Sequence, residues 1–140
     1  MRYVYPYETE RDGDVTIFRF PDVPEAITQV DPGEDFYNIA HDCLVVTLRA
    51  YVLSREVLPS PSSIGQRDTI SLDALESAKL ALYSAMREGR VSNVGLAERL
   101  GVTETVTRRL VDLQHRSHIG HVEKALKVLG RKLEVRVKAA

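Results

Sequence analysis

The segment LPSPSSIGQ at residues 58–66 divides the chain into two parts. It contains two prolines, four residues of serine or glycine and no charged side chain, a composition typical of a linker. Each part then has about 60 to 75 residues, a size at which a domain buries only about 60% of the surface that its unfolded chain exposes. We therefore expect two small domains, residues 1–62 and 73–140, joined by linker and strand residues 63–72, in a chain that self-associates.

The two parts carry opposite net charges, although the whole chain has a formal net charge of -1. Residues 1–62 contain 5 arginines and 11 acidic residues, which gives -6. Residues 63–140 contain 14 basic and 9 acidic residues, which gives +5. An asymmetry of this size indicates a cationic partner for the first part and an anionic partner for the second.

The composition excludes several classes of protein. Hydrophobic residues make up 44% of the chain, but no apolar run approaches the roughly 20 residues that cross a bilayer. The N-terminus lacks the layout of a signal peptide, so we expect a cytoplasmic protein without membrane contact. Cys43 is the single cysteine, which excludes an internal disulfide and four-thiolate or zinc-finger sites. We expect no cofactor and no metal.

The histidines at positions 115, 118 and 121 repeat every three residues. A helix that begins at Ser117 would place them on different faces, so contact with phosphate or a plain surface role is favoured over a metal site. We expect His41 to be a surface residue and Cys43 to lie in the core.

The first part changes its hydrophobic period from two to 3.6 after residue 33. Residues 2–8 and 14–20 are β-rich runs separated by Asp12-Gly13, which is typical of a hairpin, and a third run covers 26–30 after the loop at 21–24. From residue 34, apolar residues recur three or four apart, which predicts a helix to about residue 53. The result is a β-β-β-α unit with the helix on the sheet.

The second part is predicted to be mainly helical after a short strand at 69–72. Asp73 and Glu76 form a capping-box pattern that begins a helix ending at Gly89. A short helix over about 93–100 and a second helix opened by Thr103 follow. Ser117 is predicted to cap a last helix that Gly130 stops. Residues 132–138 alternate apolar and charged, which predicts a strand that pairs with its copy in a second subunit.

Residues 96–110, LAERLGVTETVTRRL, carry the most specific signal in the chain. They resemble the helix-turn-helix of phage-repressor-like regulators, with a small residue, Ala97, where two helices cross, a turn at Gly101 and a cap at Thr103. Thr107 stands where such proteins usually bury Val or Ile, so its hydroxyl must bond back into the helix. The alternative is a helical hairpin without a ligand.

The helix-turn-helix resemblance implies which residues meet DNA. Glu104, Thr105 and Arg109 would point towards base edges, where Arg reads guanine and Glu accepts from cytosine. Residues at the start of the preceding helix would grip phosphate. The implied DNA-binding set is Ser92, Asn93, Thr103, Glu104, Thr105, Arg108 and Arg109.

Motifs in both parts resemble the HicB-type antitoxins of bacterial toxin-antitoxin modules. In the first part these are Tyr5-Pro6, FPDVP at 20–24, Thr28-Gln29 and LPSPS at 58–62. In the second part they are the helix-turn-helix, HRSHI at 115–119, Ala-Leu at 125–126 and LGRKL at 129–133. The chain departs from the family pattern where Val30 and residues 31–33 replace a glycine and a shorter turn, which leaves that loop's geometry open.

The HicB resemblance implies an α+β protein. Its N-terminal domain would be a partial ribonuclease-H-like β-β-β-α(-β) domain without the catalytic carboxylates, followed by an all-α helix-turn-helix domain with a C-terminal strand. It implies a non-enzymatic antitoxin that blocks a small basic mRNA-cleaving HicA-type toxin and represses its own operon by binding double-stranded operator DNA as a homodimer or tetramer. The charge asymmetry agrees with these partners. The candidate toxin-binding residues are Asp22, Glu25 and Asp31.

Two other functions stay open at this point. The chain could be a stand-alone dimeric transcriptional regulator whose N-terminal domain senses a ligand. It could also be a nuclease that uses the acidic residues around 22 and 31–35. The nuclease is disfavoured because these carboxylates lie in proline- and glycine-containing loops, whereas metal-dependent catalysis needs them on rigid elements.

Overall fold

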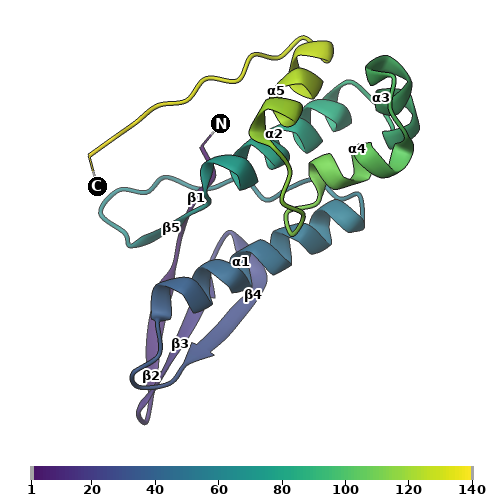
Figure 1. Ribbon diagram of the computed structural model, residues 1–140. Coiled ribbons are helices and arrows are strands. Elements are labelled where there is room, and N and C mark those ends of the chain that lie inside the picture. The colour runs from purple at the N-terminus through teal and green to yellow at the C-terminus, as the bar shows by residue number, and fades with distance from the viewer. Residues whose placement is uncertain (1, 140) are drawn as a thin grey trace. The chain divides into compact units, whose positions relative to one another are not determined.

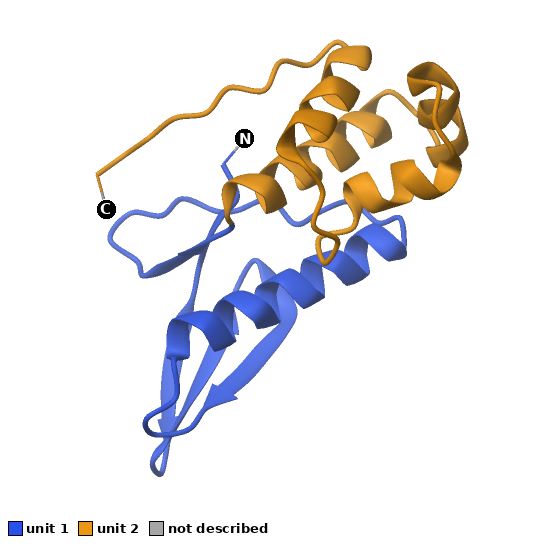
Figure 2. Cartoon of the chain, in the orientation of Figure 1, with its two compact units in different colours: residues 1–72 blue, residues 73–140 orange. Residues whose placement is uncertain are grey.

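The computed structural model describes residues 2–139, and within them the chain is an α+β protein with five helices and two small antiparallel sheets (Figure 1). It divides into two compact units, residues 1–72 and residues 73–140 (Figure 2). Residues 63–72, expected to be linker and strand, therefore belong to unit 1.

The larger sheet of unit 1 has the strand order β2-β3-β4, from Glu8–Asp12, Val15–Phe20 and Val23–Val30. Asp12 pairs with Val15, so the β2–β3 connection is a two-residue turn in which Gly13 adopts a φ of 64°. A turn this short needs a positive φ, which glycine adopts without strain. The expected hairpin is present, although its first strand extends to Asp12.

The β-rich run at residues 2–8 is divided between two sheets, contrary to the expectation of one strand. Strand β1, Val4–Pro6, pairs with β5, Thr69–Ser71, whereas Glu8 begins β2. At the change of partner, the Tyr7 amide donates to the carbonyl of Asp68 at 3.0 Å. Strand β4 begins at Val23, earlier than the expected residue 26. Pro24 does not prevent this, because β4 is an edge strand and the register shifts beside it.

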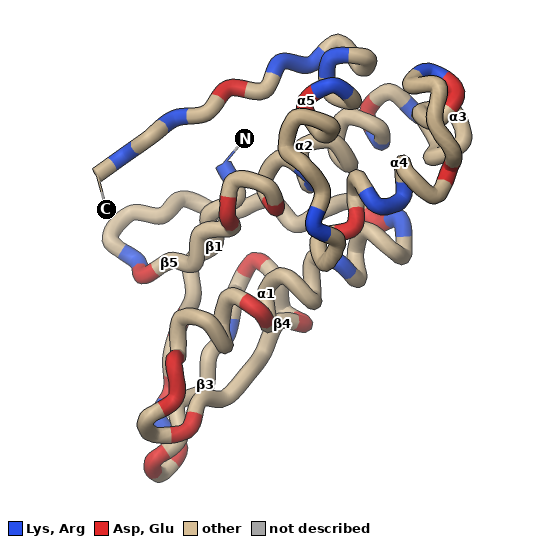
Figure 3. Tube along the Cα trace, viewed as in Figure 1, with Lys and Arg blue, Asp and Glu red and all other residues tan. Residues whose placement is uncertain are grey.

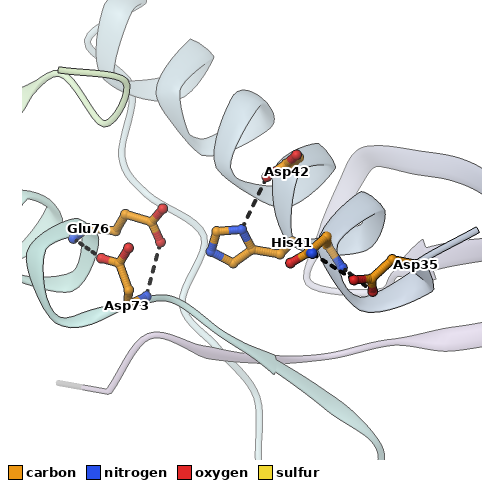
Figure 4. A network of polar contacts seen from close by, with 6 residues as sticks. Asp35, His41, Asp42, Asp73 and Glu76 are labelled. Carbon is orange, nitrogen blue, oxygen red and sulfur yellow. Dashed lines mark hydrogen bonds and ion pairs between the residues drawn. The ribbon is translucent and has the colours of Figure 1, made fainter. Parts of the chain in front are cut away.

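Helix α1, Phe36–Leu53, packs on β4, and its N-terminus is capped by Asp35. The Asp35 carboxylate accepts from the Asn38 amide at 3.2 Å and from the Asn38 side chain at 2.7 Å (Figure 4). The helix face towards the sheet is apolar and buried. Its buried residues are Ala40, Leu44, Val45, Leu48 and Val52.

Two predictions about single residues of α1 need correction. Cys43 is partly buried rather than fully in the core, and burial raises the pKa of its thiol. The side chain of His41 is only 19% exposed and lies 3.4 Å from the Asp42 carboxylate (Figure 4). Position 41 precedes Leu44 and Leu48 at helical spacing, so it flanks the buried stripe instead of facing solvent.

The segment at 58–66 is irregular, but hydrogen bonds hold it to unit 1. The Tyr5 hydroxyl donates to the carbonyl of Pro59 at 2.7 Å, and Ser62 donates to Asp22 from its amide at 2.8 Å and its hydroxyl at 2.9 Å. Arg67 donates to the Ser62 hydroxyl at 2.7 Å. Residues 58–66 therefore form an anchored loop of unit 1, although their composition is typical of a linker.

Unit 2 contains helices α2, Ala74–Glu88, α3, Asn93–Leu100, α4, Glu104–Val111, and α5, Ile119–Val128. The predicted capping box at the start of α2 is confirmed: Glu76 donates from its amide to Asp73 at 2.7 Å, and the Asp73 amide donates to the Glu76 carboxylate at 3.0 Å (Figure 4). Helix α2 packs against α4 and α5, and α3 against the same two helices.

Residues 132–138 form no strand within the single chain, and their predicted pairing with a second copy stays a prediction. The side chains of Val135 and Val137 are 70% and 90% exposed. A strand needs a hydrogen-bonded neighbour, and within the described part of this single chain no segment pairs with the tail.

Candidate functional site

The α3–turn–α4 segment is built from local hydrogen bonds that the sequence encodes. The Ser92 hydroxyl accepts from the Gly95 amide at 3.0 Å and begins α3, and the Thr103 hydroxyl accepts from the Val106 amide at 3.4 Å and begins α4. Between them Gly101 has a φ of 68° and ends α3. A Cβ at Gly101 would meet no atom within 4 Å, so its requirement is the left-handed backbone rather than space.

The inner face of this segment is closed by Leu96, Ala97 and Thr107, which are all buried. The Thr107 hydroxyl bonds to the Glu104 carbonyl at 2.8 Å, which confirms the predicted bond back into the helix. It also lies 3.0 Å from the carbonyl of Asn93. Thr107 therefore ties α4 to the first turn of α3, a contact that an apolar residue could not make.

A buried lysine of α2 holds the other end of α4. Lys79 is 0% exposed, and its ammonium donates to the carbonyls of Arg109 at 2.7 Å and Asp112 at 2.8 Å and to the Ser117 hydroxyl at 2.8 Å. All three ammonium donors are thus used, at the helix end where the dipole favours a cation. Burial lowers the pKa of Lys79 from 10.5 to about 8, against the opposing effect of Asp112.

The role of Lys79 was missed by sequence reasoning, although a signal exists. It stands between Leu75 and Leu82 at helical spacing, so the apolar stripe of α2 passes through a charged residue. The same network corrects the prediction for Ser117, whose hydroxyl also lies 3.3 Å from the Arg109 carbonyl. The N-cap of α5 is instead His118, without a side-chain cap bond.

The outer face of α4 is exposed. Glu104, Thr105, Arg108 and Arg109 are all exposed, and Glu104 and Arg108 form an ion pair at 3.7 Å. Ser92 and Thr103 are exposed as well, with their hydroxyls engaged as caps, and Asn93 is half-buried. The predicted DNA-binding residues therefore lie on one helical segment. Sequence reasoning omitted three exposed apolar side chains of the same segment, Val94, Val102 and Val106.

The three acidic residues considered for toxin contact lie in different surroundings. Asp22 accepts from Ser62, and Glu25 accepts from the Tyr51 hydroxyl at 2.8 Å, a bond that raises the pKa of Tyr51 to about 12. Asp31 is exposed and borders a groove of unit 1. Asp22 and Glu25 thus have structural bonds within the unit, and Asp31 faces an open surface.

Acidic and basic residues are distributed unequally between the units (Figure 3). Carboxylates are frequent at the β2–β3 turn and in the loop before α1, whereas basic residues lie along α4 and the C-terminal tail. Residues 73–140 contain 13 basic and 8 acidic residues, a net charge of +5. Residues 1–72 contain 6 arginines and 12 acidic residues, a net charge of -6.

Across residues 2–139, no three His, Cys, Asp or Glu side chains are grouped so that they could hold a metal ion. The rings of His118 and His121 meet edge to face with their centroids 5.4 Å apart. None of the helices in this part of the chain is long and apolar enough to cross a membrane.

Comparison with known proteins places the chain in a family. Residues 2–81 match the family described as "HicB_like antitoxin of bacterial toxin-antitoxin system". The chain is 35% identical to Antitoxin HicB 2 of Photorhabdus laumondii, over 94% of each protein. It is 33% identical to Antitoxin HicB of Pseudomonas fluorescens, over 99% of this chain and 96% of the relative. It is 29% identical to Antitoxin HicB of Escherichia coli K12, over 96% of this chain and 98% of the relative. The chain therefore belongs to the HicB-like antitoxin family, whose members are antitoxins and not enzymes.

Proposed function

We propose that this chain is a cytoplasmic antitoxin that binds and blocks a small basic HicA-type toxin and represses its own operon by binding operator DNA. The antitoxin role follows from the family. The single observation that carries the DNA-binding role is the α3–turn–α4 segment, whose inner face is buried and whose predicted base-reading residues, Glu104, Thr105 and Arg109, are exposed.

Helix α4 has the dimensions and side chains of a recognition helix. An α-helix with its side chains is about 10–12 Å across, which fits the width of about 12 Å of the DNA major groove, and the eight residues of α4 extend over about 12 Å of its axis. Arg109 would donate two hydrogen bonds to guanine, and Glu104 would accept from cytosine. The exposed methyl groups of Val102 and Val106 suit contact with thymine methyl groups.

The anchoring of α4 supports the same proposal. Thr107 fixes its first turn to α3, and Lys79 fixes its last turn to α2. A helix held at both ends loses little conformational freedom when it enters DNA, which lowers the entropic cost of binding. The net charge of +5 on residues 73–140 adds the sequence-independent attraction to phosphates.

Unit 1 is proposed as the toxin-binding part, with a partial ribonuclease-H-like fold. Its net charge of -6 is complementary to a basic RNA-binding surface and would steer the toxin towards it. We propose that the chain acts as a homodimer or tetramer, so that two α4 helices reach half-sites about one helical turn apart.

The DNA-binding role is tested with the full chain and a labelled fragment of its own promoter, by fluorescence anisotropy. Arg109→Ala should weaken binding to the promoter by about 1–3 kcal/mol and binding to a scrambled duplex much less. The control is Lys124→Ala, an exposed residue of α5 that removes the same charge. Equal losses on both duplexes would make Arg109 a phosphate contact, and no binding by the wild type would refute repression.

The antitoxin role is tested by coexpression of the chain with the protein encoded by the adjacent gene. The two proteins should copurify, and the complex should not cleave RNA that the free partner cleaves. A partner that retains full ribonuclease activity in the complex would refute neutralisation.

A further inference from the structure

A groove of about 410 Å³ opens in unit 1 where the first turn of α1 leaves the sheet face uncovered. Its walls come from residues before and on β2, from β3, from the loop before α1 and from Phe36, the first residue of that helix. Along β2, Thr9 and Arg11 line the groove, so the alternating residues Glu8 and Glu10 face the other side of the sheet. All these residues belong to unit 1.

Aromatic rings form one wall of this groove. The rings of Phe18 and Phe36 stack with centroids 5.9 Å apart and an interplanar angle of 16°. The Tyr7 ring lies 5.1 Å from Phe18 at 40°. Phe18 is buried, but Phe36 is 50% exposed, so an aromatic surface faces the open groove.

Carboxylates form the rim. Asp14, Asp31, Glu34 and Asp68 border the groove together with the single cation Arg11. The loop that carries two of these carboxylates is a closed turn: the Glu34 amide donates to the Asp31 carbonyl at 3.2 Å, and the Asp31 amide donates to the Glu34 carboxylate at 2.8 Å. Pro32 and Gly33, with a φ of 84°, occupy the central positions as in a type II turn.

We infer that this groove receives an arginine side chain of the basic toxin, an inference that rests on the proposed function. A guanidinium stacks on aromatic rings and also forms paired hydrogen bonds with carboxylates, so one side chain satisfies both the wall and the rim. The rim has four carboxylates and one guanidinium, and its net negative charge repels the phosphates of a nucleic acid. An arginine that contacts RNA in the free toxin would thus be occupied by the antitoxin.

The test compares the affinity of the adjacent gene's purified product for four variants of the full chain, by isothermal titration calorimetry. Phe36→Leu removes the exposed ring and keeps an apolar side chain, and Tyr37→Leu is its control, since Tyr37 is 43% exposed and does not line the groove. Asp31→Lys reverses a rim charge, and Glu8→Lys makes the same change on the other sheet face. Thermal unfolding of each variant verifies its fold.

We expect Phe36→Leu and Asp31→Lys each to weaken binding about tenfold and both controls to change it less than about twofold. Replacing each toxin arginine by glutamine in turn should identify one arginine whose loss makes Phe36→Leu silent. If wild type binds but groove and control variants lose affinity equally, the groove is not the site, and the antitoxin function stands.

Two further outcomes would overturn the inference for other reasons. If the wild-type chain does not bind the partner at all, the proposed function fails, and the groove has no toxin to receive. If Phe36→Leu lowers the self-associated mass in light scattering and leaves toxin affinity unchanged, the occupant is a second copy of this chain, whose tail carries Lys132, Arg136 and Lys138.

Discussion

In the folded protein the ammonium group of Lys79 donates hydrogen bonds to three protein oxygens instead of to water. Two of them are carbonyls at the end of α4, and the third is the Ser117 hydroxyl. Removing the ammonium is costly because these three oxygens lose hydrogen bonds to a charged donor, which are stronger than bonds between neutral groups. Lys79→Met should therefore lower the free energy of unfolding by about 2–3 kcal/mol in urea denaturation, although it keeps the apolar stem. Lys124→Met, on the exposed face of α5, should change it by less than about 0.5 kcal/mol.

Lys79 also gives the protein a defined dependence on alkaline pH. Its pKa is lowered from 10.5 to about 8, so between these values the unfolded chain binds more protons at this residue than the folded chain. Stability contributed by Lys79 should then increase as pH rises from about 8 and be constant below it. Tyr51, whose pKa is raised to about 12, acts in the opposite direction above pH 10.

The pH effect is measured by urea denaturation of the wild type and of Lys79→Met between pH 7 and about 9.5, below the tyrosine range. The difference in unfolding free energy between the two proteins should change with pH above 8. A difference that is constant over the whole range would show that Lys79 keeps its ordinary pKa in the folded protein.

Among the elements, the turn between α3 and α4 allows a matched pair of glycine substitutions. Gly101 has a φ of 68°, whereas Gly120 lies within α5, and a Cβ at either position would meet no neighbouring atom. Gly101→Ala should destabilise the protein by about 1 kcal/mol, because alanine is strained in the left-handed region. Gly120→Ala should stabilise it by about 0.5–1 kcal/mol, because alanine favours the helix. Denaturant midpoints with opposite shifts would verify both, and equal shifts would contradict the conformational argument.

Elements whose limits depend on neighbours in sequence were predictable, and elements that depend on distant partners were not. Asp73, Ser92 and Thr103 act within three residues, so the starts of α2, α3 and α4 follow from the sequence. The division of the first run at Tyr7 depends on Asp68, which lies about 60 residues away. The anchoring of the loop at 58–66 likewise depends on residues of β1 and of the turn before β4.

The same distinction applies to the candidate sites. The exposure of Glu104, Thr105 and Arg109 follows from the helical period of α4, which was visible in the sequence. The groove of unit 1 was not visible, because Tyr7, Phe18 and Phe36 come from three segments and meet only after the sheet and α1 have formed. The Lys79 network likewise joins residues 30 to 38 positions apart.

At the scale of the whole molecule, a chain of near-zero net charge carries -6 on residues 1–72 and +5 on residues 73–140. Charges of that size act beyond single contacts, and salt screens them within about 8–10 Å. Binding of operator DNA should therefore weaken steeply as salt increases, with a slope set by the number of phosphates neutralised. A salt series of the anisotropy titration measures this slope. An affinity that does not change with salt would rule out phosphate contacts as a source of DNA binding.

The C-terminal tail is the part of the molecule whose sequence pattern the single chain does not use. Val135 and Val137 alternate with Arg136 and Lys138, yet both valines are largely exposed. An alternating segment without a neighbouring strand presents unpaired backbone groups and an apolar face. Pairing with the same segment of a second copy would supply hydrogen bonds to the backbone groups and cover the apolar side chains. Val135→Gln with Val137→Gln should therefore lower the mass measured by light scattering, because it removes the apolar side of the pair. Arg136→Gln with Lys138→Gln changes the other side of the same segment and should leave the mass unchanged. If both double variants keep the wild-type mass, self-association does not depend on the tail, and the alternation serves no pairing in this protein.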